Sequence, residues 1–164
     1  MLTSVNGVLK GFMYNDCYFR TSSKPFDLSN LANRYVHLTN DAVQSNAEDY
    51  GKFETGNKLS INDFQLYLEK TFPTLKIQFM RDLFPRMQRL VTDSFRAVYT
   101  KVDPKRVRNG FEVFGFDFMI DENFQVHLIE CNTNPNLEVC CPLMARIVTE
   151  LLDNSLRIAV DPLF

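Results

Sequence analysis

Residues 111–135, FEVFGFDFMIDENFQVHLIECNTNP, contain two apolar runs on either side of a polar turn. Runs of this length, rich in aromatic and β-branched residues, predict two β-strands joined as a hairpin. Asp117 nevertheless lies in the middle of the first run, and Glu130 and Asn132 end the second. A carboxylate inside a folded core is costly unless a partner compensates its charge. These polar side chains therefore need either solvent or a ligand.

The pairing of the two strands decides whether these polar groups meet. Because strand side chains alternate between faces, Glu130 and Asn132 project together. A two-residue loop at Glu122–Asn123 would place Asp117 opposite Leu128 and diagonal to Glu130. A four-residue loop would place Asp117 directly opposite Glu130. Both registers put the polar groups on one face, whereas a three-residue loop would move Asp117 to the other face.

Two carboxylates this close repel each other unless a proton or a cation lies between them. Carboxylate and amide oxygens are ligands that suit Mg²⁺, which prefers octahedral oxygen coordination and often recruits substrate phosphates. The hairpin is therefore a candidate magnesium site formed by Asp117, Glu130 and Asn132. The alternative is a solvated sheet face that binds nothing, because acidic residues alternate on many exposed strands.

The rest of the pattern predicts an α+β chain in which helices pack on antiparallel sheet. Residues 7–21 predict a hairpin that turns at Asn15–Asp16. Residues 35–38, YVHL, predict a strand, and residues 39–58 predict a long polar loop.

Three helices are predicted between Ser60 and the end of the chain. The first begins at Ser60, where Asp63 completes a capping-box pattern. The second covers residues 75–101, with a kink or break expected at Pro85. The third is strongly amphipathic and begins at Pro142, a residue that suits the first helical position.

Length and composition narrow the function classes. The 164 residues suit one domain or part of a larger one, and the net charge of −2 does not favour nucleic-acid binding. The sequence contains no apolar run long enough to span a membrane and no signal-peptide pattern at Met1, so no membrane partner is expected. The cysteines (Cys17, Cys131, Cys140 and Cys141) lack CxxC spacing, which favours reduced thiols in a cytosolic protein.

Four blocks of the sequence resemble the tubulin-tyrosine ligase family, a branch of the ATP-grasp ligases. Residues 114–135 resemble its metal-binding hairpin, and YFRTSSKPF (18–26) and RYVHLTNDAVQ (34–44) resemble two signature blocks in the family's order. Residues 48–70 continue the match, so that the resemblance covers nearly the whole chain. It implies an ATP-grasp-like C-terminal subdomain over residues 1–164, and we expect the N-terminal portion of such a domain to be missing.

The resemblance also implies a role for each matching residue. The implied site residues are Arg20 as the catalytic residue near the γ-phosphate, Thr39 and Asn40 at ATP, and Asp117, Glu130 and Asn132 at Mg²⁺. An arginine can clamp phosphate oxygens through two hydrogen bonds, which agrees with the role implied for Arg20. Without the resemblance, Arg20 would be interpreted as an ordinary exposed arginine.

The implied activity is an ATP- and Mg²⁺-dependent ligation of free tyrosine, glycine or glutamate to a protein carboxylate through an acyl phosphate. The implied acceptor is the acidic C-terminal tail of tubulin, which implies a cytoplasmic location on the microtubule cytoskeleton, including cilia. HLTNDAVQS, residues 37–45, lacks the Asn-Lys that polyglutamylases of the family often carry after HLTN, and Gln44 is closer to the tyrosine-ligase and glycylase branches. This leaves the added amino acid open. The alternative is a non-catalytic tubulin-binding module descended from such a ligase, and the chain by itself is expected to be inactive.

Other polar residues are expected to be structural. His37 lies on the predicted strand and is expected to form a local hydrogen bond. His127 is expected to point away from the face that carries Glu130, and Cys131 is expected to lie in the core. The basic segment KVDPKRVR, residues 101–108, suits either an acidic peptide or a solvated loop.

Overall fold

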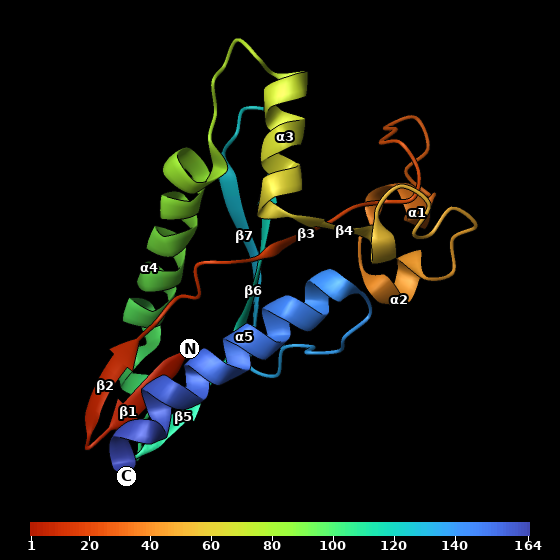
Figure 1. The fold of residues 1–164 in the computed structure, drawn as a ribbon. Helices are drawn as coiled ribbons and strands as arrows, with labels where there is room; N and C mark the ends of the chain where they lie inside the picture. The colour runs from red at the N-terminus through yellow and green to blue at the C-terminus, as the bar shows by residue number, and fades with distance from the viewer. The chain divides into compact units, whose positions relative to one another are not determined.

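The computed structural model describes all residues from Met1 to Phe164, and it confirms an α+β chain with three small antiparallel sheets and three main helices (Figure 1). The chain divides into two units. Unit 1 comprises Met1–Asn15, Ile77–Glu138 and Val148–Phe164, and unit 2 comprises Asp16–Lys76 and Val139–Ile147. The boundary between them falls inside the last long helix.

Unit 1 contains two antiparallel sheets. In the first, β1 (Leu2–Val5) pairs with β2 (Val8–Gly11) on one side and with β5 (Gly110–Glu112) on the other. The second is a hairpin of β6 (Gly115–Ile120) and β7 (Val126–Asn132). The predicted hairpin within residues 111–135 is thus confirmed, although its first residues belong to β5 and the other sheet.

The first hairpin of the chain turns at Asn6–Gly7, where β2 pairs back on β1. Residues 7–21 therefore do not form the predicted hairpin, and its predicted turn at Asn15–Asp16 is wrong. Asn6 has φ 52° and Gly7 has φ 80°, the left-handed values that a tight turn between twisted strands requires. Asparagine followed by glycine is the strongest short-range signal for such a turn, because both residues tolerate positive φ.

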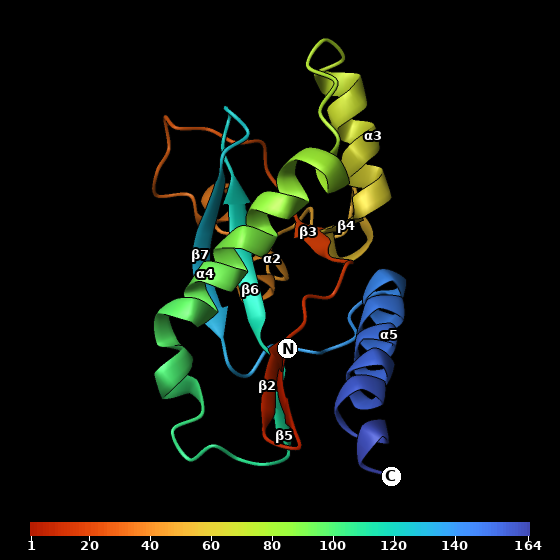
Figure 2. The same cartoon turned by 90° about the vertical axis from the view of Figure 1, so that its left-hand side faces the viewer.

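One face of the β6–β7 hairpin is covered by α4 (Phe84–Val102), which runs along it in both views (Figures 1 and 2). The ring of Phe95 on α4 packs in T-shaped geometry against Phe114 and Phe116, with ring centroids 5.0 Å and 5.5 Å apart. These contacts bury aromatic surface in the geometry that rings prefer. The other face of the hairpin is the one that carries the acidic residues.

The predicted helix over residues 75–101 is divided as expected near Pro85. A π-helical turn, Phe79–Leu83, precedes α4, and Pro85 lies in the first turn of α4, where a missing N–H is tolerated. Phe79 and Leu83 are almost completely buried and anchor this turn.

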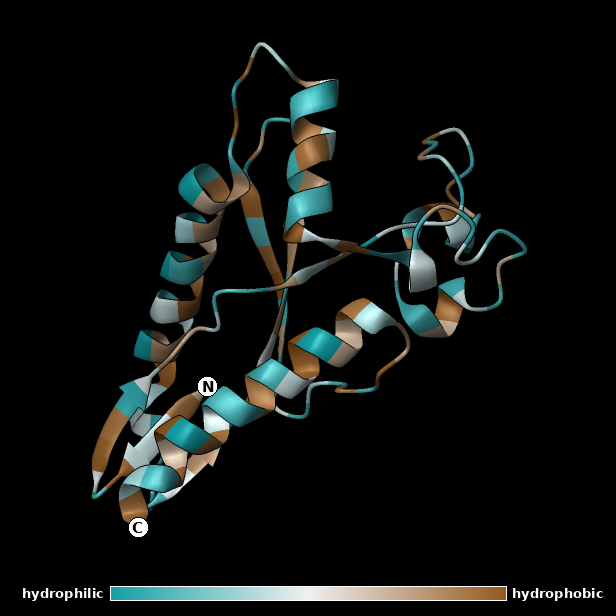
Figure 3. Cartoon of the chain, in the orientation of Figure 1, coloured by the Kyte–Doolittle hydropathy of each residue, from teal (hydrophilic) through white to brown (hydrophobic).

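The third predicted helix is confirmed as α5 (Pro142–Ala159). Both α5 and α4 carry apolar as well as polar residues in every few positions, as the mixed colours of the two helices in Figure 3 show. Its buried positions include Met144, Ile147 and Val148, which follow helical spacing. No helix of the chain combines the length and the apolar character needed to cross a membrane.

Unit 2 is built around a short antiparallel ribbon. The elements are β3 (Tyr18–Arg20), α1 (Arg34–His37), α2 (Asp41–Gln44), a 3-10 turn at Thr55–Asn57, β4 (Lys58–Ser60) and α3 (Ile61–Thr71). Phe19 of β3 stacks on Phe64 of α3 with ring centroids 4.0 Å apart, which packs the helix on the ribbon. The predicted capping box is present, since the Ser60 hydroxyl accepts from Asp63 N and the Asp63 carboxylate accepts from Ser60 N.

Two predictions for unit 2 are wrong. Residues 35–38 form no strand, because Asn33 caps a helical turn there by accepting a hydrogen bond from Tyr35 N at 3.1 Å. Residues 39–58 are not one long loop, since they include α2 and the 3-10 turn before β4.

Candidate functional site

The β6–β7 hairpin brings its three predicted ligands together. Asp117 lies directly opposite Glu130, and Gly115 lies directly opposite Asn132. Cross-strand partners project to the same face of a sheet, so Asp117, Glu130 and Asn132 share one face. Within this group, Asn132 Nδ2 donates a hydrogen bond to Glu130 Oε1 at 3.1 Å.

A β-bulge creates this arrangement. Ile120 pairs with Val126, which leaves an odd number of residues, 121–125, in the loop. Continued without interruption, this register would pair Asp117 with Ile129 and send Glu130 to the opposite face. The register instead shifts by one residue between Phe118 and Asp117, which restores the pairing of Asp117 with Glu130. The two-residue and four-residue loops considered from the sequence are therefore both absent.

The same bulge corrects the prediction for His127. This residue pairs with Met119, which lies two positions after Asp117 on the regular strand and therefore on the same face. His127 thus projects from the face that carries Glu130, and the prediction that it points away is wrong. Its ring nitrogen Nε2 lies 2.8 Å from Asp121 Oδ2, so it serves the turn of the hairpin.

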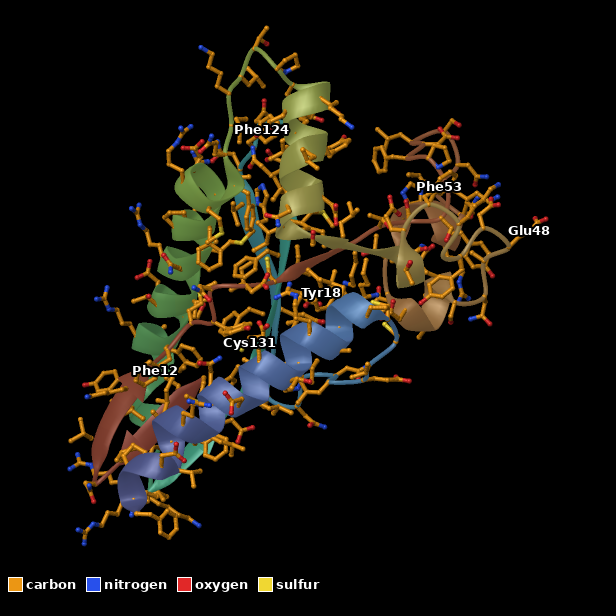
Figure 4. The ribbon with its side chains drawn as sticks, viewed as in Figure 1. Phe12, Tyr18, Glu48, Phe53, Phe124 and Cys131 are labelled. Carbon is orange, nitrogen blue, oxygen red and sulfur yellow. The ribbon has the colours of Figure 1, made fainter.

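Asp121 organises that turn. Its Oδ1 accepts hydrogen bonds from Asn123 N and Gln125 N, each at 2.9 Å. The hydrogen bond from His127 and these backbone bonds hold the pKa of Asp121 below its ordinary value. Arg86 on α4 donates to Phe124 O at 2.9 Å, which ties the turn to the helix, and Figure 4 shows Phe124 at this end of the hairpin.

Replacing Asp121 with alanine should open the turn. We expect the Asn123 and Gln125 amides to exchange with solvent at least about tenfold faster in Asp121→Ala, because both lose their acceptor. Asp121→Asn keeps an oxygen at this position and should keep most of the protection. Because the pKa of Asp121 is lowered, its carboxylate stabilises the turn above the ordinary aspartate pKa and stops doing so as the pH falls through the lowered value. Equal exchange rates in all three proteins, measured by NMR, would contradict this role.

Gly115 leaves room for the chain that follows β7. A Cβ atom at Gly115 would lie 3.0 Å from Pro135 Cβ and 3.9 Å from Asn132 Cβ. The segment after Asn132 therefore folds back over a position that has no side chain, next to the acidic face.

A methyl group at this position should displace Pro135. We expect Gly115→Ala to lower the free energy of unfolding by about 1–3 kcal/mol, the usual range for overpacking. Gly110→Ala is the matched control, because its Cβ would meet only Val107 Cγ1 at an ordinary 3.5 Å. Urea unfolding of the two variants measures the difference, and equal midpoints would show that the contact with Pro135 yields without strain.

The cysteines lie outside this acidic group. Cys131 pairs with Phe116 and projects away from Glu130, as expected. It is exposed, however, so the prediction that it lies in the core is wrong. Burial raises the pKa of the Cys17 thiol to about 12, so this thiol is not a nucleophile at neutral pH. No group of three or more His, Cys, Asp and Glu side chains is arranged to hold a metal. The hairpin brings together two such side chains, Asp117 and Glu130, beside the Asn132 amide.

The other predicted site residues belong to unit 2. Arg20 ends β3 and lies directly opposite Lys58 of β4. Thr39 is half-buried after α1, and Asn40 is exposed at the start of α2. The side chain of Asn40 makes no capping hydrogen bond, and its carbonyl accepts from Val43 N.

An ion pair made by a buried lysine lies among these residues, and the sequence did not reveal it. The Lys58 side chain is 1% exposed, and its Nζ pairs with the Asp41 carboxylate and donates to Gly56 O at 3.2 Å. It also lies 5.6 Å from the centroid of the Tyr18 ring. The pair links the strand opposite Arg20 to the helix that follows Asn40, and a lysine within a strand is the only local signal for it.

The structure also shows the contacts of His37 and the exposure of the basic segment 101–108. His37 Nε2 lies 3.0 Å from Asn30 O, which confirms the expected local hydrogen bond, and its ring meets Phe26 edge-on. The basic side chains of residues 101–108 are exposed, an arrangement compatible with either use considered for them.

Comparison with known proteins finds one family along the whole chain. The model of the tubulin-tyrosine ligase family matches residues 1–164. The chain is 30% identical to tubulin glycylase 3B of Tetrahymena thermophila over 92% of its own length and 12% of that protein's. It is 32% identical to tubulin glycylase 3A of Drosophila melanogaster, with 92% of the chain and 15% of the relative covered. For tubulin glycylase 3B of Drosophila melanogaster the identity is 30%, over 98% of the chain and 21% of the relative. The chain thus spans about a fifth or less of these curated relatives.

Proposed function

Because the chain belongs to the tubulin-tyrosine ligase family, we propose that it takes part in the ATP- and Mg²⁺-dependent ligation of an amino acid to a carboxylate of tubulin. The observation that carries this proposal is the pairing of Asp117 with Glu130 on one face of a hairpin, beside Asn132. We assign residues 1–164 to the C-terminal part of an ATP-grasp domain, acting in the cytoplasm on microtubules, including those of cilia.

The donor set of the hairpin fits a hard cation. Two carboxylates face each other, and their repulsion falls when a cation lies between them. The Asn132 amide nitrogen donates to Glu130, so the amide oxygen is the atom that Asn132 offers to a metal. Asp117, Glu130 and Asn132 would together hold Mg²⁺, which neutralises phosphate charge when bound.

The residues of unit 2 are assigned to the nucleotide. Arg20 would contact the γ-phosphate, because its guanidinium stays charged and donates two parallel hydrogen bonds. Arg20 lies directly opposite Lys58 on the paired strand, so two cationic side chains come from neighbouring positions of this ribbon, and Lys58 pairs with Asp41. Thr39 and Asn40 would contact ATP, and the exposed amide of Asn40 suits this role.

The proposed reaction has two steps. A carboxylate oxygen of the acceptor attacks the γ-phosphorus of ATP, which releases ADP and forms an acyl phosphate. The amine of the free amino acid then attacks the acyl carbon, loses a proton and displaces phosphate, so that an amide bond remains. Arg20 contributes by stabilising the charge that develops on the transferring phosphoryl group.

We propose glycine as the amino acid and tubulin as the acceptor. The relatives described above are named tubulin glycylases, and the chain matches them over at least nine-tenths of its length. Glutamate and tyrosine are the alternatives to be tested against glycine.

The test transfers the chain into a working relative. Residues 1–164 replace the matching segment of Drosophila tubulin glycylase 3A, which gives a chimera called here the exchange protein. We expect ATP-dependent incorporation of labelled glycine, but not of labelled glutamate or tyrosine, into purified tubulin. The chain alone should be inactive, since it spans 15% of that relative.

Two other outcomes decide against this function. Incorporation of glutamate or tyrosine by the exchange protein would overturn the choice of glycine. An exchange protein that binds tubulin but transfers no amino acid would support a non-catalytic tubulin-binding module.

A further inference from the structure

Gln44, the last residue of α2, is completely buried, and its side-chain amide is hydrogen-bonded at both ends. Its Oε1 accepts from Ser23 N at 2.8 Å. Its Nε2 donates to Tyr35 O at 3.2 Å and to Leu38 O. A buried amide is tolerated only when it is hydrogen-bonded in this way, so its partners are held in defined positions.

A second buried amide, Asn57, extends the network. Its Nδ2 donates to Thr21 O at 3.2 Å and to Ser23 Oγ at 2.9 Å, and its Oδ1 accepts from Gly51 N at 2.8 Å. It also lies 3.5 Å from Gln44 Oε1, so the two amides form one cluster.

The cluster fixes two short segments that flank the residues assigned to the nucleotide. Thr21 follows directly after Arg20, Ser23 lies two residues further on, and Leu38 directly precedes Thr39. Gln44 is bonded to both segments, through Ser23 N and Leu38 O. Gln44 is therefore the side chain that connects the segment after Arg20 to the segment before Thr39.

We propose that Gln44 is a positioning residue that holds Thr39–Asn40 in a fixed relation to Arg20. This inference rests on the proposed function, which assigns these residues to ATP. A side-chain amide is required here, because one side chain must accept a hydrogen bond from Ser23 N and also donate hydrogen bonds to the carbonyls of Tyr35 and Leu38. An ionised glutamate has no donor, and methionine has the size of glutamine but offers neither strong group.

The first arm of the test follows backbone amides in the 164-residue chain. In Gln44→Met, we expect Ser23 N–H to exchange with solvent at least about tenfold faster than in the unmodified chain, and the amides of residues 38–40 to become less protected with it. The control is Leu68→Ala, which removes a buried apolar side chain of unit 2 without touching the cluster. The two variants are compared at temperatures that give equal global stability.

The second arm measures kinetics in the exchange protein. Gln44→Met should raise KM for ATP about tenfold, while KM for glycine stays within about twofold, because the cluster adjoins the residues assigned to the nucleotide. Leu68→Ala at matched stability should leave both constants unchanged. A raised KM for ATP with an unchanged KM for glycine therefore distinguishes a positioning role of Gln44 from a general loss of stability.

Unchanged protection of Ser23 in Gln44→Met would overturn the inference, and so would equal loss of protection in Leu68→Ala. An unchanged KM for ATP in an active exchange protein would also overturn it. Failure of the proposed function is a different result, namely an unmodified exchange protein that incorporates no amino acid, and the amide-exchange arm still decides on Gln44 in that case.

Discussion

Glu130→Gln should reduce amino-acid incorporation by the exchange protein at least about a hundredfold, the scale on which removal of one group that stabilises developing charge is felt. The substitution keeps the size of the side chain and an oxygen that can accept from Asn132 Nδ2. It removes one of the two negative charges that face each other across the hairpin. The remaining activity should therefore need more Mg²⁺, because the site has lost charge that attracts the cation.

The stability of the same variant distinguishes a metal ligand from a structural ion pair. Without Mg²⁺, Glu130→Gln should melt at the same temperature as the unmodified protein or higher, because the repulsion with Asp117 is relieved. A structural ion-pair partner would instead leave a cation unpaired and lower the melting temperature.

The experiment combines melting without metal and turnover across a Mg²⁺ series. Glu112→Gln is the matched control, because Glu112 is an exposed acid on β5 of the same unit and should be neutral in both measurements. Retained turnover with an unchanged Mg²⁺ requirement would exclude the metal role of Glu130.

Arg20→Lys should lower turnover about a hundredfold to a thousandfold and change KM for ATP only modestly. Lysine keeps the positive charge but lacks the planar group that donates two parallel hydrogen bonds to a phosphate. Because charge on the transferring phosphoryl group develops mainly in the transition state, the loss should appear in kcat.

Steady-state kinetics of the exchange protein with varied ATP measure this effect. Arg34→Lys, at an exposed position on α1 of the same unit, controls for a general effect of replacing arginine. Turnover at the unmodified level in Arg20→Lys would show that Arg20 does not contact the reacting phosphate. A rise in KM for ATP with unchanged kcat would assign it to ground-state binding only.

The helix boundaries were predictable from local sequence signals. Ser60 with Asp63, Pro85 and Pro142 each mark a helix boundary that the structure confirms. These signals act between residues a few positions apart, so no knowledge of distant neighbours is needed. The turn at Asn6–Gly7 carried an equally local signal, and it could have been predicted from the same rules.

The candidate site was only partly predictable for the same reason. The sequence by itself determined that Asp117, Glu130 and Asn132 lie on paired strands, and strand alternation predicted one shared face. It did not determine the bulge, on which that shared face depends. The bulge is a matter of register between two strands, and register is set by the packing of the whole hairpin. The prediction for His127 was wrong for the same reason, because the face from which this side chain projects depends on the strand register around the bulge.

The polar cluster of unit 2 was decided by tertiary structure alone. The pair of the buried Lys58 with Asp41 joins residues 17 positions apart, and the contact of Gln44 with Ser23 joins residues 21 positions apart. In the sequence, each of these side chains is an ordinary polar residue that would be expected at the surface. The burial of Lys58 and Gln44 becomes possible only when folding brings matching donors and acceptors together, since an unpaired polar group would be too costly inside the protein. Local patterns thus determined the elements and the candidate ligands, and the long-range pairing of polar groups determined how they are held.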